Sequence, residues 1–203
     1  MIKRMFDVVL ALASLILLLP VMVVVALLIK CDSTGTIFFK QERMGRGFRP
    51  FLIYKFRTMR QHSDHDGSLV TIGRDPRITR AGWFLRKTKI DEIPQLINVL
   101  KGDMSFVGPR PEVRRYVELF PREYAEILTV RPGITDLASL KYRDEAALLG
   151  KAEDPDKEYL SHVLPDKIQL AKDYLQRSSF LFDLSLILKT LVKLFGYGMR
   201  MSS

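Results

Sequence analysis

The chain is poor in cysteine and short of acidic residues. Cys31 is the single cysteine among 203 residues, which excludes an intrachain disulfide framework and a cysteine-built zinc site. Lysine and arginine number 32 against 23 aspartate and glutamate residues, leaving a formal charge of +9. Such a basic chain is expected to meet an anionic partner: nucleic acid, acidic lipid or a phosphorylated substrate. Its length and 47% apolar content allow one sizeable core.

A long apolar run near the N-terminus predicts a membrane anchor. Residues 8–29 carry no charge, and as a helix they would extend about 33 Å, enough to cross a bilayer core. Pro20 lies inside the run and removes the donor that the carbonyl of Ile16 needs, and basic residues stand on both sides. A spanning helix and a re-entrant helix, which enters and leaves on the cytoplasmic face, are both compatible with this pattern. No small-residue cleavage site follows, so a removed signal peptide is disfavoured.

Two stretches after the anchor predict a β-hairpin. Residues 36–41 and 50–58 are rich in Ile, Phe and Tyr, with a glycine-bearing segment between them. Lys55 and Arg57 alternate with aromatic residues, so both are expected on one strand face, where they bind phosphate or line a solvated edge. Histidines and aspartates crowd together in residues 61–67. We interpret this polar, glycine-ended stretch as a solvated loop rather than a metal site.

An acidic pair in the middle of the chain is the candidate catalytic site. Pro94 lacks an N–H, so a helix here can contain it only in its first turn, which places Asp91 and Glu92 at the helix N-terminus. Apolar residues then recur every three or four positions until Gly102 ends the helix. The positive end of the helix dipole is expected to keep Asp91 ionised and to favour a phosphate nearby.

Basic residues flank this pair in the sequence. An ionised carboxylate, cationic phosphate ligands and a divalent metal would together indicate phosphoryl-group chemistry. A plain helix N-cap is the alternative, and the Asp-Glu pattern alone favours it. The flanking cations are Arg86, Lys87, Lys89 and Arg110.

The second half of the chain predicts short helices and an amphipathic end. Residues 112–119, 121–128 and 165–177 are expected to be helical, and residues 136–142 to form a strand. Over about residues 180–196, apolar side chains recur at helical spacing beside a basic row. This apolar stripe either packs on the core or lies in the membrane interface.

Several motifs distributed over nearly the whole chain carry a family resemblance. They are FKQERMG at 39–45, YKFRTM at 54–59, DPRIT at 75–79, LRKT at 85–88, DEIPQLINVLKGDMSFVGPRP at 91–111 and RPGIT at 131–135. With these motifs and its proline-containing apolar run, the chain resembles the compact members of the bacterial sugar transferases, the monotopic polyprenol-phosphate phosphoglycosyltransferases.

The resemblance implies an enzyme that uses Mg²⁺ and begins the assembly of a glycoconjugate. Such an enzyme moves a sugar 1-phosphate from a UDP-sugar to a polyprenyl phosphate, such as undecaprenyl phosphate, and releases UMP. It implies that Asp91 is the nucleophile of a covalent aspartyl-phosphosugar intermediate, and that Glu92 acts beside it in metal binding or proton handling. By matching position, the candidate phosphate-binding residues are Lys55, Arg86, Arg110 and Arg131.

The family fold implies a mainly helical α+β protein. Residues 1–30 would form a re-entrant membrane anchor, and residues 31–203 a compact cytoplasmic catalytic domain with a short β-hairpin and interfacial amphipathic helices. The expected location is the bacterial inner membrane, with the catalytic domain on the cytoplasmic face. Donor, acceptor and membrane lipids are the expected partners, without nucleic acid, and a homodimer is allowed. The alternative is a non-enzymatic basic scaffold that binds acidic lipid or nucleic acid at the membrane surface.

Two places depart from the family pattern. Many members have serine before the kinking proline, where this chain has Leu19, so the kink must be stabilised in another way. After RPGIT many members continue GWAQ, whereas residues 136–139 here are DLAS. The sugar preference is therefore not transferred from the family.

Overall fold

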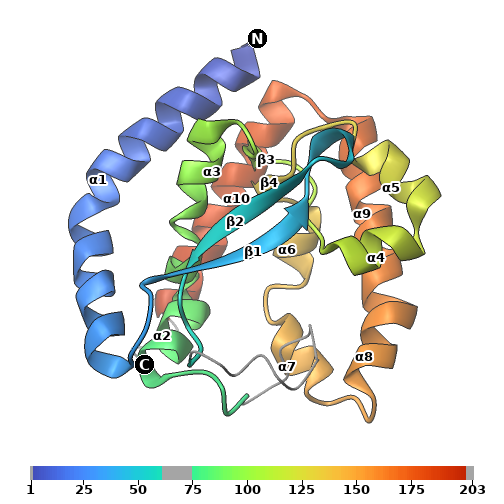
Figure 1. The fold of residues 1–203 in the computed structure, drawn as a ribbon. Helices are drawn as coiled ribbons and strands as arrows, with labels where there is room; N and C mark the ends of the chain where they lie inside the picture. The colour runs from blue at the N-terminus through green and yellow to red at the C-terminus, as the bar shows by residue number, and fades with distance from the viewer. Residues whose placement is uncertain (1, 61–74, 200–203) are drawn as a thin grey trace.

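The computed structural model describes residues 2–60 and 75–199, with side-chain surroundings up to residue 194. Within this part the chain is mainly helical with two small sheets, so the expected α+β class is confirmed (Figure 1). The predicted loop at residues 61–67 and the side chain of Phe195 lie outside it. The elements are α1 (Ile2–Asp32), β1 (Phe38–Met44), η1 (Arg46–Phe48), β2 (Pro50–Phe56), α2 (Arg80–Thr88), η3 (Ile90–Glu92), α3 (Gln95–Lys101), β3 (Ser105–Val107), α4 (Arg114–Leu119), α5 (Pro121–Ile127), β4 (Gly133–Thr135), α6 (Leu137–Lys141), α7 (Glu145–Leu149), α8 (Pro155–Glu158), η4 (Tyr159–Val163), α9 (Leu164–Arg177) and α10 (Phe180–Met199).

The helix α1 runs along one side of the molecule and bends on its way (Figure 1). Pro20 lies inside it, and the helix continues through this residue to a total of 31 residues. Ala11, Val25 and Ile29 pack against the domain, with Leu15 and Leu18 partly buried beside them, while most other leucines and valines between them face outward. In the described chain it is the one helix long and apolar enough to cross a membrane, and only 11% of its most apolar window is buried. This exposed apolar surface indicates membrane association.

Both ends of α1 are bound to the same folded domain. Near the first end, Lys3 Nζ donates to the carbonyl of Val107 (2.9 Å) and forms an ion pair with Asp183 of α10 (2.6 Å). At the last turn, Asp32 Oδ2 accepts a hydrogen bond from the backbone N–H of Ala81 in α2 (3.0 Å). The helix is therefore fixed to the domain at two distant points.

The predicted hairpin is confirmed: β1 and β2 pair antiparallel, from Phe38 opposite Phe56 to Met44 opposite Pro50. The expectation that Lys55 and Arg57 lie on one face of this strand is wrong for Arg57. The strand β2 ends before Arg57, whose guanidinium folds back onto the end of α1 and donates to the carbonyl of Ser33 (2.7 Å). Ser33 directly follows α1, where the last carbonyls of the helix lack intrahelical donors, so Arg57 satisfies one of the carbonyls at this end of the helix.

A second sheet brings together two turns that are distant in the sequence. The strands β3 and β4 pair in parallel, and Gly108 and Gly133 lie where their backbones meet. A Cβ atom on Gly133 would lie 2.1 Å from the backbone nitrogen of Gly108, so only glycine allows this approach. Gly133 N donates to the carbonyl of Pro109 (3.0 Å), and Gly108 N donates to that of Thr135 (3.2 Å). The GPRP and RPGIT turns are thereby locked to each other.

The strand expected over residues 136–142 is wrong, because these residues form α6. Asp136 precedes the helix in an extended conformation and accepts a hydrogen bond from Ser139 N (2.6 Å). An aspartate in this place is a strong helix N-cap, and it starts the helix directly after the short strand β4. The helices predicted over residues 112–119, 121–128 and 165–177 are confirmed as α4, α5 and α9.

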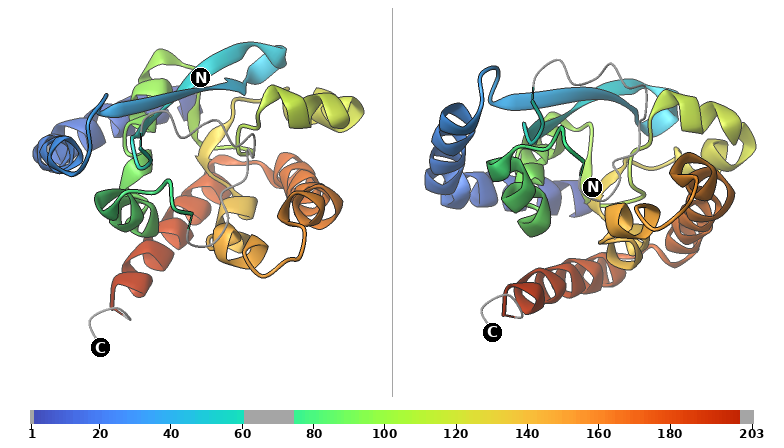
Figure 2. Two further views of the ribbon diagram at one scale, coloured as in Figure 1. Left: turned by 60° about the horizontal axis from the view of Figure 1, so that its bottom comes forward. Right: turned by 90° about the horizontal axis from the view of Figure 1, so that it is seen from below.

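The C-terminal helix α10 lies on the opposite side of the molecule from the hairpin (Figure 2). Leu186 is fully buried against Val107 and Tyr174, so this face of α10 packs on the core. The apolar stripe recognised in the sequence lies mostly on the exposed faces of the helix. Its side chains are between 37% and 55% exposed at Phe180, Leu184, Leu188 and Leu191.

Candidate active site

Asp91 and Glu92 lie in the single 3₁₀ turn η3, between α2 and α3. Lys89, just before this turn, has a left-handed backbone (φ 61°) that reverses the chain out of α2. Pro94 occupies the N-cap position of α3, and no side chain caps that helix. The interpretation of the acidic pair as a helix cap is therefore wrong, since Pro94, which has no side-chain oxygen, occupies that position.

The Glu92 carboxylate is held by two cations. Its Oε1 accepts hydrogen bonds from Lys55 Nζ (2.9 Å) and Arg110 Nη2 (2.7 Å), and its Oε2 from Arg110 Nη1 (3.4 Å). Burial acts to raise the pKa of Glu92, but Arg110 and then Lys55 outweigh it and place this pKa well below its usual value. Glu92 in turn raises the pKa of Arg110. Glu92 is thus a fixed negative charge.

Asp91 is buried beside this ion cluster with a carboxylate oxygen left unbonded. The side chain is only 7% exposed, and its Oδ1 has no hydrogen-bond partner within the described part of the chain. Burial raises the pKa of Asp91, and Lys55 is the strongest influence in the other direction. The expectation that a helix end keeps Asp91 readily ionised is wrong, because α3 begins only at Gln95 and desolvation dominates. An orphaned, buried acidic oxygen is a common mark of a functional site.

Arg86 comes to the same place from α2. Its Nε donates to Thr58 Oγ1 (2.8 Å), and α2 can lie this close to the end of the hairpin because residue 82 is glycine. A Cβ on Gly82 would lie 2.0 Å from the carbonyl oxygen of Thr58. Burial lowers the pKa of Arg86, and the charge of Asp91 opposes that shift. The structure therefore brings together Asp91, Glu92, Lys55, Arg86 and Arg110.

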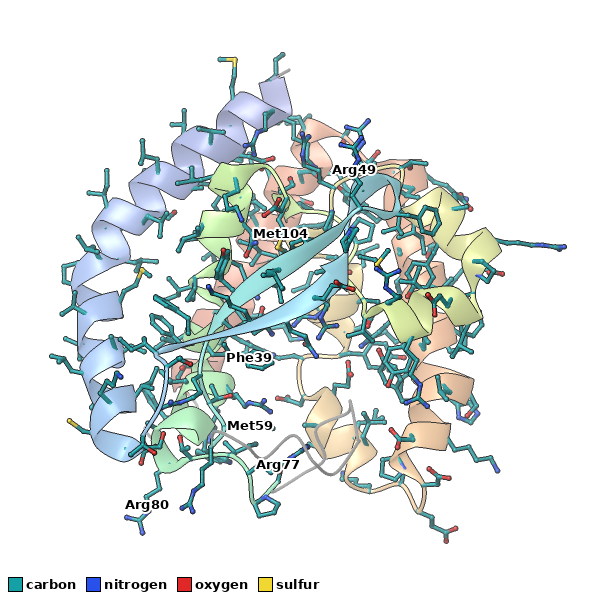
Figure 3. All side chains as sticks on the ribbon, viewed as in Figure 1. Phe39, Arg49, Met59, Arg77, Arg80 and Met104 are labelled. Carbon is teal, nitrogen blue, oxygen red and sulfur yellow. The ribbon has the colours of Figure 1, made fainter. Side chains whose placement is uncertain are left out.

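Arg131 does not join this cluster. Its Nε donates to the carbonyl of Gly102, at the C-terminal end of α3 (2.8 Å). In Figure 3, Met104 lies near the upper end of α3, two residues beyond Gly102. Met59 lies near the bottom of the view, next to Thr58, which binds Arg86. Arg131 thus lies at the far end of α3 from the acidic pair.

The pattern of the sequence missed three polar residues that support the site. Asn98 is fully buried and ties α3 to β2, since its amide donates to the carbonyl of Leu52 (2.7 Å) and accepts from Tyr54 N (2.9 Å). Arg43 donates to the carbonyl of Pro111 (3.3 Å), the last residue of the GPRP turn that carries Arg110. A polar residue on an otherwise apolar helix face was the available signal for Asn98. The third residue, Asp136, gave no such signal.

Mg²⁺ requires oxygen ligands, and the side chains near Asp91 can be matched to this requirement. No group of three or more His, Cys, Asp or Glu side chains gathers within residues 2–60 and 75–199. Mg²⁺ commonly takes one or two carboxylates and completes its shell with water and substrate phosphates. The unbonded Oδ1 of Asp91 fits that requirement, whereas both oxygens of Glu92 accept from Arg110 or Lys55. The residues present fit a magnesium ion held through Asp91.

Comparison with known proteins identifies the family of the chain. A family model described as bacterial sugar transferase matches residues 1–197. The UDP-N-acetylgalactosamine-undecaprenyl-phosphate N-acetylgalactosaminephosphotransferase of Aeromonas hydrophila is 40% identical over 203 residues, which cover 98% of this chain and 45% of that protein. The exopolysaccharide production protein PSS of Rhizobium leguminosarum bv. phaseoli is 40% identical over 200 residues, covering 94% and 93%. The UDP-glucose:undecaprenyl-phosphate glucose-1-phosphate transferase of Xanthomonas campestris pv. campestris is 37% identical over 199 residues, covering 96% and 39%. The chain therefore spans less than half of the Aeromonas and Xanthomonas proteins and nearly all of the Rhizobium one.

Proposed function

The chain belongs to the bacterial sugar transferase family, and we propose that it transfers a sugar 1-phosphate from a UDP-sugar to undecaprenyl phosphate. Two similar proteins are named for this donor class and this acceptor, one for N-acetylgalactosamine and one for glucose, so the sugar itself stays open. The observation that carries the proposal is the unbonded, buried oxygen of Asp91 beside a Glu92 held by Lys55 and Arg110.

The proposed reaction has two displacements at one phosphorus. An oxygen of Asp91 attacks the phosphorus that bears the sugar, the bond to the bridging oxygen breaks, and UMP leaves with the electron pair. An oxygen of the acceptor phosphate then attacks the same phosphorus and releases Asp91. Donor and acceptor are both anionic, so an enzyme-bound intermediate spares them a direct encounter between two full anions.

The cations around Asp91 support this chemistry. Lys55 from β2 and Arg86 from α2 lie close enough to Asp91 to act on its charge, and Lys55 and Arg110 bind the neighbouring Glu92, so positive charge stands beside the reacting carboxylate. Positioned cations stabilise the negative charge that builds up in phosphoryl transfer. A magnesium ion held through Asp91 would add charge neutralisation on the phosphate oxygens. Lys55 and Arg110 meanwhile keep Glu92 ionised at the edge of the site.

The membrane placement is part of the same proposal. A spanning helix has its ends on opposite sides of the bilayer, whereas Lys3 and Asp32, near the two ends of α1, both bind one domain. This arrangement supports a re-entrant anchor over residues 1–30 that enters and leaves on the cytoplasmic face. The exposed apolar side chains of α10 support contact with the membrane interface. The remaining domain, residues 31–203, then works at the cytoplasmic face of the bacterial inner membrane.

A non-enzymatic scaffold is a weaker explanation of the same surface. A binder of acidic lipid or nucleic acid needs exposed cations, whereas Lys55 and Arg110 are committed to a buried carboxylate. Its binding would also be indifferent to Asp91 and would fall steeply with salt.

The test is turnover of the detergent-extracted protein with a panel of UDP-sugars, Mg²⁺ and undecaprenyl phosphate, measured as UMP release. We expect Asp91→Asn to lose activity by about 10³-fold or more, the scale seen when a nucleophile is removed. Asp144→Asn is the matched control, because Asp144 is exposed and caps nothing with its side chain. Full turnover by Asp91→Asn would reject Asp91 as the nucleophile.

A further inference from the structure

Asp136 is a buried carboxylate outside the ion cluster, and both of its oxygens are bonded to backbone. It is 2% exposed. Its Oδ2 accepts from the backbone N–H of Arg110 (3.0 Å), and its Oδ1 accepts from that of Ser139 (2.6 Å). The first of these bonds joins the start of α6 to the turn that carries the arginine bound to Glu92.

The chemistry of that turn makes this bond important. Pro109 and Pro111 have no backbone N–H, so Arg110 supplies the one donor of the Pro-Arg-Pro segment. Asp136 takes that donor. The carbonyl of Pro109 is fixed separately by Gly133 N (3.0 Å). The turn is therefore pinned by Gly133 at the first proline and by Asp136 at Arg110.

A small cavity of about 20 Å³ lies against Arg110, with Asp136, Glu112 and Lys167 among its lining residues. This is room for one water molecule. At the backbone of Arg110 itself, the hydrogen bond to Asp136 is the directional restraint, and Arg43 holds the carbonyl of Pro111 beyond it.

We propose that Asp136 is a positioning residue. It holds the backbone of Arg110 in the place from which the guanidinium donates two hydrogen bonds to Glu92. This inference rests on the proposed function for its effect on turnover. Arg110 reaches Glu92 at 2.7 and 3.4 Å, and a shift of about 1 Å in its backbone would break this geometry.

Two substitutions separate this role from capping α6. Asp136→Ser keeps an oxygen that can cap the helix through Ser139 N but loses the second acceptor. Asp136→Asn keeps the size but presents an amide NH₂ to one of the two N–H groups. We expect either variant to lower kcat/KM for the UDP-sugar roughly 10- to 100-fold, the scale of a misplaced catalytic group. The loss should appear in kcat with the KM for the UDP-sugar little changed, because a displaced guanidinium weakens stabilisation of the reacting phosphoryl group more than it weakens donor binding.

The double variant Arg110→Ala/Asp136→Ser should be no worse than Arg110→Ala, because Asp136 acts through Arg110. Asp154→Ser is the matched control: Asp154 caps α8 by accepting from Lys157 N (3.0 Å) and should leave kcat and KM unchanged. A folded Asp136→Ser or Asp136→Asn protein with wild-type kcat would overturn the inference.

A second measurement keeps the inference separate from the proposed function. If the wild-type protein releases no UMP from any UDP-sugar, the proposed function fails, and urea unfolding still decides the role of Asp136. The losses of unfolding free energy in Arg110→Ala, in Asp136→Ser and in the double variant are compared at one pH. We expect the double variant to lose less than the sum of the two single losses, because Asp136 acts through Arg110. Additive losses would reject the positioning role.

Discussion

Asp91 and Glu92 are neighbours in one buried turn, yet their surroundings drive their pKa values in opposite directions. Burial raises the pKa of Asp91, while Arg110 and Lys55 overcome the same burial at Glu92 and lower its pKa. Pairs of acids whose environments separate their pKa values commonly have different roles. Glu92 is the permanent charge that binds the cations, and in the proposed reaction Asp91 is the group whose ionisation decides activity.

This separation predicts the pH dependence of turnover. Asp91 must be ionised to attack, so kcat/KM should fall toward acid with an apparent pKa above the ordinary 3.8 of aspartate. Lys55 is the strongest influence that lowers the Asp91 pKa, so Lys55→Gln should move the acid limb to still higher pH. UMP release measured between about pH 3 and 9 checks this, since the range brackets the ordinary carboxyl values.

The hairpin offers a matched control for that experiment. Lys40 pairs with Tyr54 in the register and therefore points to the opposite face from Lys55. Lys40→Gln removes the same charge from the same sheet and should leave the acid limb in place. An equal shift in both variants would mean that overall charge, rather than the site, sets the limb.

A second residue-scale prediction concerns stability. Arg110→Ala leaves the buried Glu92 carboxylate with Lys55 as its remaining charged partner, so the free energy of unfolding should fall by about 1.5–3 kcal/mol. Arg114→Ala removes a guanidinium from a pair with Glu42 whose two side chains are 53% and 52% exposed, and should change little. Urea unfolding in detergent compares the two, and equal losses would contradict the special position of Arg110.

At the scale of elements, the sequence predicted the pieces whose signal is local. Alternating apolar residues around a glycine-bearing turn predicted the hairpin, and apolar spacing between Pro94 and Gly102 predicted α3. The prediction of a strand over residues 136–142 was wrong. Asp136 caps a helix here because β4, just before it, ends where it pairs with β3. Parallel pairing joins segments far apart in the sequence, and no local pattern reports it.

The same parallel pair gives the element-scale prediction. In Gly133→Ala the new Cβ would lie 2.1 Å from the Gly108 nitrogen, so β3 and β4 must separate and the GPRP turn must move. We expect a loss of stability of about 1–3 kcal/mol from overpacking, together with a loss of turnover. Gly150→Ala is the control, since Gly150 has an ordinary φ of −67° at the end of α7. A Gly133→Ala protein with normal melting temperature and normal turnover would contradict the close approach.

At the scale of the whole molecule, the candidate site shows how far sequence reasoning reaches. Motifs indicated Asp91, Glu92, Lys55, Arg86 and Arg110 together, and the structure gathers them in one place. Arg131 follows an equally clear motif and lies at the other end of α3 instead. Its side chain serves the helix end nearest to it, and that proximity depends on the tertiary fold. The raised pKa of Asp91 was missed for a similar reason, since burial is a property of the assembled molecule.

The attachment of both ends of α1 predicts the topology of the chain in the membrane. A probe at residue 2 and a probe near residue 33 should both be labelled by an impermeant reagent from the cytoplasmic side, in inverted vesicles and not in intact cells. The contacts of Lys3 and Asp32 with one domain require the two probes to share one side, and the proposed placement makes that side the cytoplasmic one. Labelling of the two probes from opposite sides would establish a spanning helix and contradict the re-entrant placement.

In the proposed re-entrant placement, attachment of both ends of the anchor also sets the height of Asp91 over the lipid headgroups. The lipid phosphate must reach that height, while the rest of its isoprenoid tail stays in the bilayer and contributes nothing further to the encounter. Acceptors that differ only in the far part of their tails should therefore react at similar rates. Tolerance of tail length follows from the way the helix is tied to the domain.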